Sequence, residues 1–163
     1  MSVEMQNIHG LEGVLEALKQ LPADIVSKNG GVVRVALRKG AVVFVKQAKQ
    51  NVQRIISEDE ARGGDQAVST GALLKAIGTV RDRHPEQSGA NERYVVKARR
   101  APKVHNLSPA QYGRDMEFGF EHQTAKPWMT PAYYARRQEA LDTVVRELKK
   151  GVDKAILKAA ARV

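Results

Sequence analysis

Apolar residues recur at every third or fourth position in three stretches of the chain, a spacing that places them on one face of an α-helix. The first stripe predicts a short amphipathic helix over 11–21, which ends where Pro22 follows. The second predicts a long helix over 33–56, with the charged residues largely off the apolar stripe. Gly40 weakens this helix by about 1 kcal/mol relative to alanine, which is too little to end it.

The third stripe predicts a C-terminal helix over 131–160. Thr130 is a suitable N-cap, and Pro131 suits the first helical position because its fixed φ angle is already helical. Lysine and arginine residues gather in the C-terminal half of this stretch, where the helix dipole favours positive charge. Part of the basic character of the chain therefore has a structural explanation.

Three shorter stretches predict β-strands, at 77–83, 93–99 and 112–120, where apolar and polar residues come close to alternating. The segment between the first two contains the proline, glycine and asparagine residues of a long hairpin tip. The acidic, glycine-containing segment 57–69 lacks periodicity and is expected to be an exposed connection. We therefore expect one α+β domain over 1–163, with a small antiparallel sheet of about three to four strands flanked by the two long helices.

The composition is typical of a soluble globular protein with one core: 163 residues, of which 42% are hydrophobic and 28% charged. Because there is no cysteine, thiolate nucleophiles, cysteine-ligated zinc and iron–sulfur clusters are excluded. No apolar run approaches the ~20 residues of a membrane span, and the first residues lack the pattern of a signal peptide. We expect a protein that is made in the cytoplasm and has no membrane partner.

The formal net charge of +9 is the unusual feature of the composition. The surplus is densest in residues 61–110, which carry nine basic and four acidic side chains. A polyanion such as DNA is one explanation, because each neutralised phosphate releases counterions, and ordinary solvated surface charge is the other. The candidate DNA-facing residues are Arg81, Arg83, Arg93, Arg99, Arg100 and Lys103.

Six of the eight aromatic residues fall in one segment, 112–134. Large rigid side chains gathered in this way are either the main anchors of the core or an interface hot spot, and we expect most of them to be core anchors. The six residues are Tyr112, Phe118, Phe120, Trp128, Tyr133 and Tyr134.

Two short blocks in this segment, Glu117-Phe118-Gly119 and Ala125-Lys126-Pro127-Trp128-Met129-Thr130-Pro131-Ala132, match a known pattern in order and spacing. They resemble the tail-completion or neck protein family of long-tailed bacteriophages. In that family Glu-Phe-Gly-Thr ends a strand, and Ala-Arg-Pro-Phe-Leu-Arg-Pro-Ala opens the last helix after a loop. The two preceding helices and the turn at 70–73 fit the same plan, so the resemblance covers nearly the whole chain. Phe120 departs from the usual threonine, and Asp115 from the usual apolar residue.

The resemblance implies a structural virion protein that joins head and tail as an oligomeric ring around the DNA path, located at the head–tail junction or the head-proximal tail end. Six subunits, a tail terminator and the tail tube as neighbours, and passing genomic DNA are implied in the same way. No enzymatic activity and no cofactor are implied. The residues expected to pack or to form an interface are Glu117, Phe118, Gly119, Lys126, Pro127, Trp128, Met129 and Pro131.

These residues also have physical interpretations that do not depend on the family. Gly119 suits a strand end that turns sharply, and Trp128 can pack between sheet and helix or protrude into a neighbour. Glu117, on the predicted third strand, is within reach of Arg114 and Lys126. The sequence is compatible with a partly buried ion pair at Glu117 and with an exposed ion pair that contributes little to stability.

Catalytic patterns are weak in this sequence. The four histidines are scattered, and no HExxH, GxSxG or P-loop occurs. Asp115, Glu117 and Glu121 with Lys126 only superficially resemble a nuclease cluster, because Glu121 falls beyond a predicted turn. We therefore expect no enzyme. The alternative function is a stand-alone nucleic-acid-binding module that uses the basic strip 81–103, although Tyr94 is the one aromatic residue available there for stacking.

Overall fold

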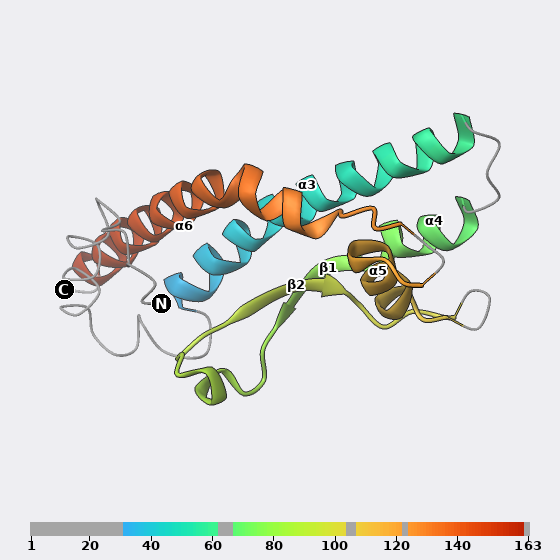
Figure 1. Cartoon of the computed structure of the whole chain (residues 1–163). Helices are drawn as coiled ribbons and strands as arrows, with labels where there is room; N and C mark the ends of the chain where they lie inside the picture. Colours follow the sequence, from blue (N-terminus) through green and yellow to red (C-terminus); the bar gives the residue numbers. More distant parts are fainter. Residues whose placement is uncertain (1–30, 62–66, 104–106, 122–123, 162–163) are drawn as a thin grey trace, which may run out of the picture.

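The computed structural model describes residues 31–61, 67–103, 107–121 and 124–161 (Figure 1). The fold is α+β, with two long helices, a two-stranded sheet and two shorter helices. Its elements in chain order are α3 (Val32–Ala61), α4 (Ala67–Ala76), β1 (Ile77–Arg81), the 3-10 helix η1 (Pro85–Ser88), β2 (Tyr94–Ala98), α5 (Pro109–Phe118) and α6 (Met129–Ala160). None of the helices in these segments is long and apolar enough to cross a membrane.

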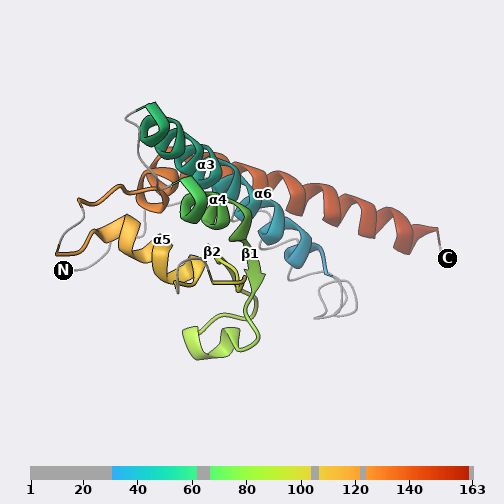
Figure 2. The same cartoon turned by 90° about the vertical axis from the view of Figure 1, so that its right-hand side faces the viewer.

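Helix α3 is the central element, because it packs against α6, α4 and both strands. In Figure 1 it lies between α6 and the hairpin, and Figure 2 shows α4 between α3 and α5. The predicted helix over 33–56 is confirmed and continues to Ala61. The interpretation of 57–69 as a connection is therefore wrong at both ends, since α4 already begins at Ala67. Glutamate and alanine are strong helix formers, which explains the extension of α3.

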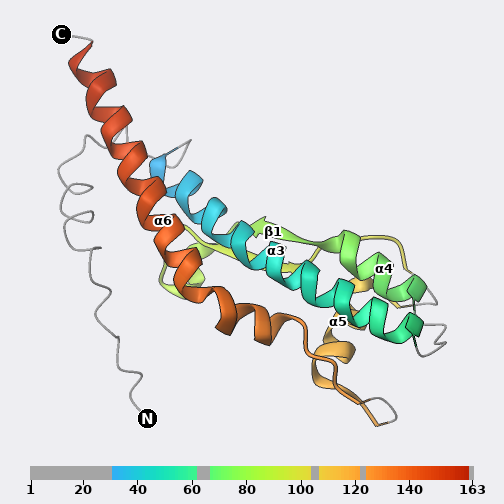
Figure 3. The ribbon, with the colours of Figure 1, turned by 90° about the horizontal axis from the view of Figure 1, so that it is seen from above.

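Helices α3 and α6 cross closely near the N-terminal half of α3 (Figure 3). A Cβ atom at Gly40 would collide with a γ-carbon of Val144 and lie 3.1 Å from the carbonyl oxygen of Ala140. Ala36, one turn away, has no exposed surface and packs with Leu148. Gly40 is thus not merely a weak point of the helix: the absence of a side chain is what lets α6 approach.

The two strands form an antiparallel hairpin in which Ile77 pairs with Ala98 and Arg81 with Tyr94. The predictions of strands over 77–83 and 93–99 are confirmed, with slightly shorter bounds. The tip contains η1, whose C-cap is Gly89, and the φ of 70° at this residue lies in the left-handed region that favours glycine.

The predicted third strand over 112–120 is wrong, because this segment forms helix α5. Ser108 caps the helix by accepting a hydrogen bond from the backbone N–H of Gln111 (3.2 Å), and Gly119 ends it with a φ of 73°. The buried positions follow a helical spacing that the apparent alternation concealed. They are Pro109, Gly113, Met116 and Glu117.

The main core lies where α3, α4, β1, α5 and the start of α6 meet. Its buried residues are Ala48, Val52, Ile55, Leu73, Ile77, Met116, Trp128 and Ala132. The predicted C-terminal helix is confirmed over most of its length, but it begins two residues early, at Met129, so Thr130 lies inside the helix and is not its N-cap. The helix predicted over 11–21 lies outside the described residues.

Replacing Gly40 by alanine tests the close crossing of α3 and α6. The added methyl group would overlap Val144, an overpacking that costs about 1–3 kcal/mol and exceeds the gain of up to ~1 kcal/mol in helix propensity. We expect a lower free energy of unfolding in urea. Gly71→Ala is the matched control, because nothing lies within 4 Å of the new Cβ in α4, and it should leave stability unchanged or raise it. Equal effects of the two substitutions would contradict the close crossing.

Candidate functional site

The carboxylate of Glu117 joins the end of α5 to the start of α6. One oxygen accepts hydrogen bonds from the backbone N–H groups of Trp128 (2.7 Å) and Met129 (2.8 Å), and the other accepts one from Thr130 (2.8 Å). These N–H groups belong to the first turn of α6, where no intrahelical acceptor exists for them. A negative charge there also suits the positive end of the helix dipole. Glu117 therefore caps α6 from a distance of eleven residues in the chain.

Two opposing effects act on the pKa of Glu117. Burial favours the neutral acid and would raise the pKa, whereas hydrogen bonds from the Thr130 hydroxyl and from the three backbone N–H groups favour the carboxylate. The hydrogen bonds prevail, so the pKa lies below its ordinary value. The group is consequently ionised at neutral pH although its residue is buried.

Trp128 is the side chain that the capped turn holds in the core. Its indole N–H donates to the carbonyl oxygen of Gly113 (2.8 Å), and its own carbonyl accepts from the side-chain amide of Asn51 (2.9 Å). A Cβ at Gly113 would lie 3.2 Å from the indole ring and 2.9 Å from Leu73, so α5 presents bare backbone to both. Of the two sequence interpretations of Trp128, the structure selects burial within this chain.

A chain of polar side chains continues from Trp128 along the α3–α6 interface. Asn51 accepts a hydrogen bond from the amide of Gln47 (3.1 Å), and Gln47 in turn accepts one from the guanidinium of Arg136 on α6 (2.7 Å). Arg136 also pairs with Glu139 at 2.7 Å. The capped turn is thus connected to α3 as well as to α5.

Other residues of the two blocks lie close to the junction, by which we mean the contact of Glu117 with residues 128–130. The backbone N–H of Lys126 donates to the carbonyl of Met116 (2.8 Å), which closes the loop between the two blocks. Arg114 lies 3.6 Å from Asp115, and the carboxylate of Glu117 accepts from backbone N–H groups, an interaction that the sequence did not predict. Because α5 is a helix, Asp115 and Glu117 no longer share a face, and the superficial nuclease cluster loses its geometric basis.

Four of the six clustered aromatic residues are exposed, so the expectation that most are core anchors is wrong. Phe118 is 75% exposed, at the end of α5, and Tyr133 stacks on Phe44 with ring centroids 5.8 Å apart. Tyr134 meets the edge of Tyr133 at 5.4 Å. The exposed residues are Phe118, Phe120, Tyr133 and Tyr134. Such rings at a surface are typical of a contact area for a partner.

The candidate DNA-facing residues do not form one patch. Arg81 makes a bidentate pair with Glu92, at 2.6 and 2.8 Å, and Arg93 lies 3.5 Å from Asp82, so the hairpin neutralises part of its own charge. The hydrogen bonds from Arg81 lower the pKa of Glu92. The remaining candidates are exposed residues of the hairpin and of the chain that leaves it: Arg83, Arg99, Arg100 and Lys103.

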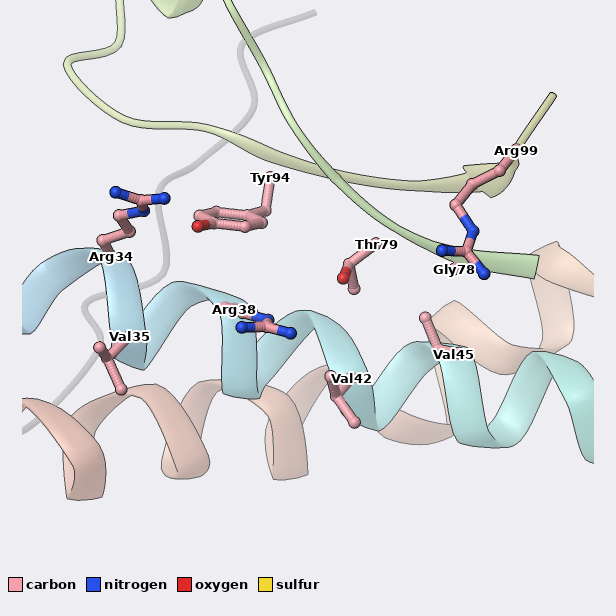
Figure 4. Close-up of a pocket in the computed structure, with 9 residues that line it drawn as sticks. All are labelled: Arg34, Val35, Arg38, Val42, Val45, Gly78, Thr79, Tyr94 and Arg99. Atoms are coloured by element: carbon pink, nitrogen blue, oxygen red, sulfur yellow. The ribbon is translucent and has the colours of Figure 1, made fainter. Parts of the chain in front are cut away.

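Arg99 instead belongs to a cleft of about 600 Å³ between the N-terminal half of α3 and the hairpin, shown in Figure 4. Arg34 and Arg38 enter this cleft from α3, and the hydroxyl-bearing side chains of Thr79 and Tyr94 line it from the two strands. Sequence reasoning missed the two α3 arginines as binding candidates. Their i, i+4 spacing off the apolar stripe was the available signal.

Among the described residues, none of the three cleft arginines has an ion pair within 4.0 Å, and no carboxylate lines the cleft. A second cleft, of about 400 Å³ between α3 and α6, differs in this respect because Lys39 pairs with Glu147 and Arg136 with Glu139 along it. Of these two clefts, the first, which we call the arginine cleft, therefore presents positive charge that no carboxylate in its lining neutralises.

Comparison with known proteins adds no assignment: no family model, no curated protein and no solved structure matches the chain. Within the described segments there is also no group of three or more histidine, aspartate or glutamate residues that could hold a metal ion. The candidate functional features are therefore the capped junction, the exposed aromatic residues and the arginine cleft.

Replacing Glu117 by glutamine tests the capped junction. Glutamine keeps one acceptor oxygen, but its NH₂ group cannot accept from a backbone N–H, and the charge is lost. Hydrogen bonds to a charged group contribute about 1.5–3 kcal/mol each, so we expect the free energy of unfolding to fall by about 2–4 kcal/mol. Glu139→Gln, at an exposed pair on α6, is the control and should change stability by less than about 0.5 kcal/mol. Similar losses in both variants would refute the capping role.

The lowered pKa of Glu117 also predicts a pH dependence. Its contribution to stability is fully present above the ordinary value of about 4.5 and is lost as the pH falls through the lower, folded-state value. Unfolding measured below pH ~4.5 should therefore show a shallower loss of stability in Glu117→Gln than in the unaltered protein. Some slope should remain from Glu92 and Glu147, whose pKa values are lowered by Arg81 and Lys39. Identical slopes would count against this assignment.

Proposed function

We propose that this chain is a structural virion protein of a tailed bacteriophage, a tail-completion or neck component that joins head and tail. In this proposal it forms an oligomeric ring around the DNA path, at the head–tail junction or the head-proximal end of the tail. Its neighbours are a tail-terminating ring and the tail tube, and it performs no chemistry of its own.

The observation that carries this proposal is the contact between the two sequence blocks on which the resemblance rests. Glu117 of the first block accepts hydrogen bonds from Trp128, Met129 and Thr130 of the second, within 2.8 Å. The glutamate, the loop and the aromatic residue before the last helix therefore act as one structural unit. Two blocks that contact each other in the folded chain form one unit, and a match of such a unit to the family pattern is stronger support than two separate short matches.

The exposed aromatic residues support a role in assembly. Phe118 and Phe120 lie beside the loop that joins α5 to α6, and Tyr133 and Tyr134 lie in the second turn of α6. Rings of this size that stay in water lower the solubility of a monomer, and they are enriched at the centres of protein interfaces. A ring subunit has such interfaces on two sides.

The alternative, a stand-alone nucleic-acid-binding module, gains less support. Two of its candidate residues, Arg81 and Arg93, are already engaged by acidic side chains of the hairpin. Its one candidate for base stacking, Tyr94, is half-buried and lines the arginine cleft. Tight binding of duplex or single-stranded DNA at physiological salt, with a steep salt dependence, would favour this alternative.

Negative-stain microscopy tests the proposal directly. The purified protein is mixed with tails and with neck rings isolated from particles of the phage that encodes it. We expect additional ring-shaped density at the head-proximal end of the tail, and antibody against the chain should label the same position in intact particles. Density elsewhere, or no binding to either component, would overturn the proposal.

Substitution of an exposed ring separates assembly from folding. Phe118→Ala should change the free energy of unfolding by less than about 0.5 kcal/mol, because the ring is 75% exposed, yet it should reduce binding to tails or neck rings. Trp128→Ala removes a buried ring and should cost about 3–5 kcal/mol. Gln138→Ala, at an exposed position of α6, is the control for binding. Unchanged binding of the Phe118 variant would remove this surface from the proposal.

A further inference from the structure

The charges at the two ends of α3 oppose the helix dipole, with Arg34 in the first turn and Glu58 in the last. Its sequence up to residue 57 carries six basic and no acidic side chains, and its last turn contains Glu58, Asp59 and Glu60. Positive charge near the N-terminus and negative charge near the C-terminus of a helix are both unfavourable. Within the described residues Glu58 has only a weak, exposed contact with Arg54, at 3.7 Å. The contacts within the described part of the chain therefore do not account for this arrangement.

The arginine cleft lies at the other end of the same helix. Arg34 and Arg38 line it from the first two turns of α3, whereas Glu58 is in the last turn, about 30 Å from Arg38 at 1.5 Å per residue. Figures 1 and 3 show the two ends at opposite sides of the molecule. The acidic turn of one chain cannot reach the cleft of the same chain.

We propose that the acidic last turn of α3 in one copy docks in the arginine cleft of the next copy, a head-to-tail contact that repeats around a ring. This inference rests on the proposed function for its expectation of a ring and identifies the two surfaces that form it. The surfaces differ from each other, as a heterologous interface requires, and their charges are complementary.

The lining of the cleft favours a protein segment over a nucleic acid. Its polar side is formed by guanidinium and hydroxyl groups, which bind carboxylates well, and Figure 4 shows the Arg34 side chain extending from α3 toward the side of Tyr94. The α3 side also contributes Val35, Val42 and Val45, which have no counterpart in a phosphodiester backbone. Arg34 lies within electrostatic range of Glu92 without pairing with it, so its guanidinium remains available.

Cysteine cross-linking tests the contact in a chain that has no cysteine of its own. The variant Thr79→Cys/Ser57→Cys carries one thiol in the cleft and one directly before the acidic turn, too far apart to join within a copy, and it keeps the Glu58 carboxylate. Oxidation at increasing protein concentration, and in assembled particles, should give a ladder of covalent oligomers that ends at the ring size. Thr79→Cys/Gln138→Cys is the matched control and should give no ladder. A ladder no stronger than the control in either preparation would overturn the inference.

Charge reversal tests the same contact without cross-links. Arg38→Glu and Glu58→Arg should each raise the dissociation constant of self-association by at least about tenfold in sedimentation velocity, and the double variant should recover most of the loss. Lys97→Glu makes the same charge change outside the cleft and should have little effect. Glu58→Arg also suits the helix dipole, so its Tm should not fall, which separates loss of docking from loss of folding. Additive losses in the double variant would contradict the pairing.

The outcomes separate this inference from the proposed function. A ladder of cross-linked oligomers together with no density on tails or neck rings would contradict the proposed function and would still support the proposed interface. Density at the tail end without a ladder in particles would support the proposed function and contradict the proposed interface. If Arg38→Glu instead abolishes binding of a short DNA duplex and leaves self-association unchanged, the cleft is a nucleic-acid site and the inference is wrong.

Discussion

The structure depends on one carboxylate in the last turn of α5 that caps the start of α6. Glu117 accepts hydrogen bonds from three N–H groups at the start of α6, which have no acceptor within the helix, and so fixes where α6 starts. That position places Trp128 in the core, where its indole and its carbonyl reach α5 and α3. A single buried charge, compensated by backbone dipoles, thereby sets the relative placement of three helices.

The same junction determines what the molecule leaves at its surface. Trp128 is buried, whereas Phe118, Tyr133 and Tyr134 are exposed. The opposite side of α3 carries the arginine cleft. Exposed aromatic surface near the junction and unneutralised charge at a distance from it are both features that assembly could use.

Sequence periodicity was sufficient to predict α3, α6 and the hairpin, because the two helices are long and the hairpin has a well-marked turn. It failed at α5, where ten residues offer too few turns to distinguish a helical spacing from alternation. The sequence does contain residues that mark the two ends of α5: Ser108 before Pro109, and Gly119 after the last turn. Each of these residues alone is a weak indication of a helix end, and only their combination predicts the helix. Of the motif residues, Glu117 and Trp128 are buried, whereas Phe118 and Pro127 are exposed. The hydrogen bonds of Glu117 were not predicted, because they join positions eleven to thirteen residues apart across a loop.

The sequence by itself determined the class of fold and the two long helices, since these follow from local spacing and composition. Tertiary structure alone decided which aromatic residues are buried, which arginines are neutralised and which converge in a cleft. The physical reason is that burial and ion pairing depend on neighbours distant in sequence. Arg34, Arg38 and Arg99 become one site only because the hairpin folds back on α3.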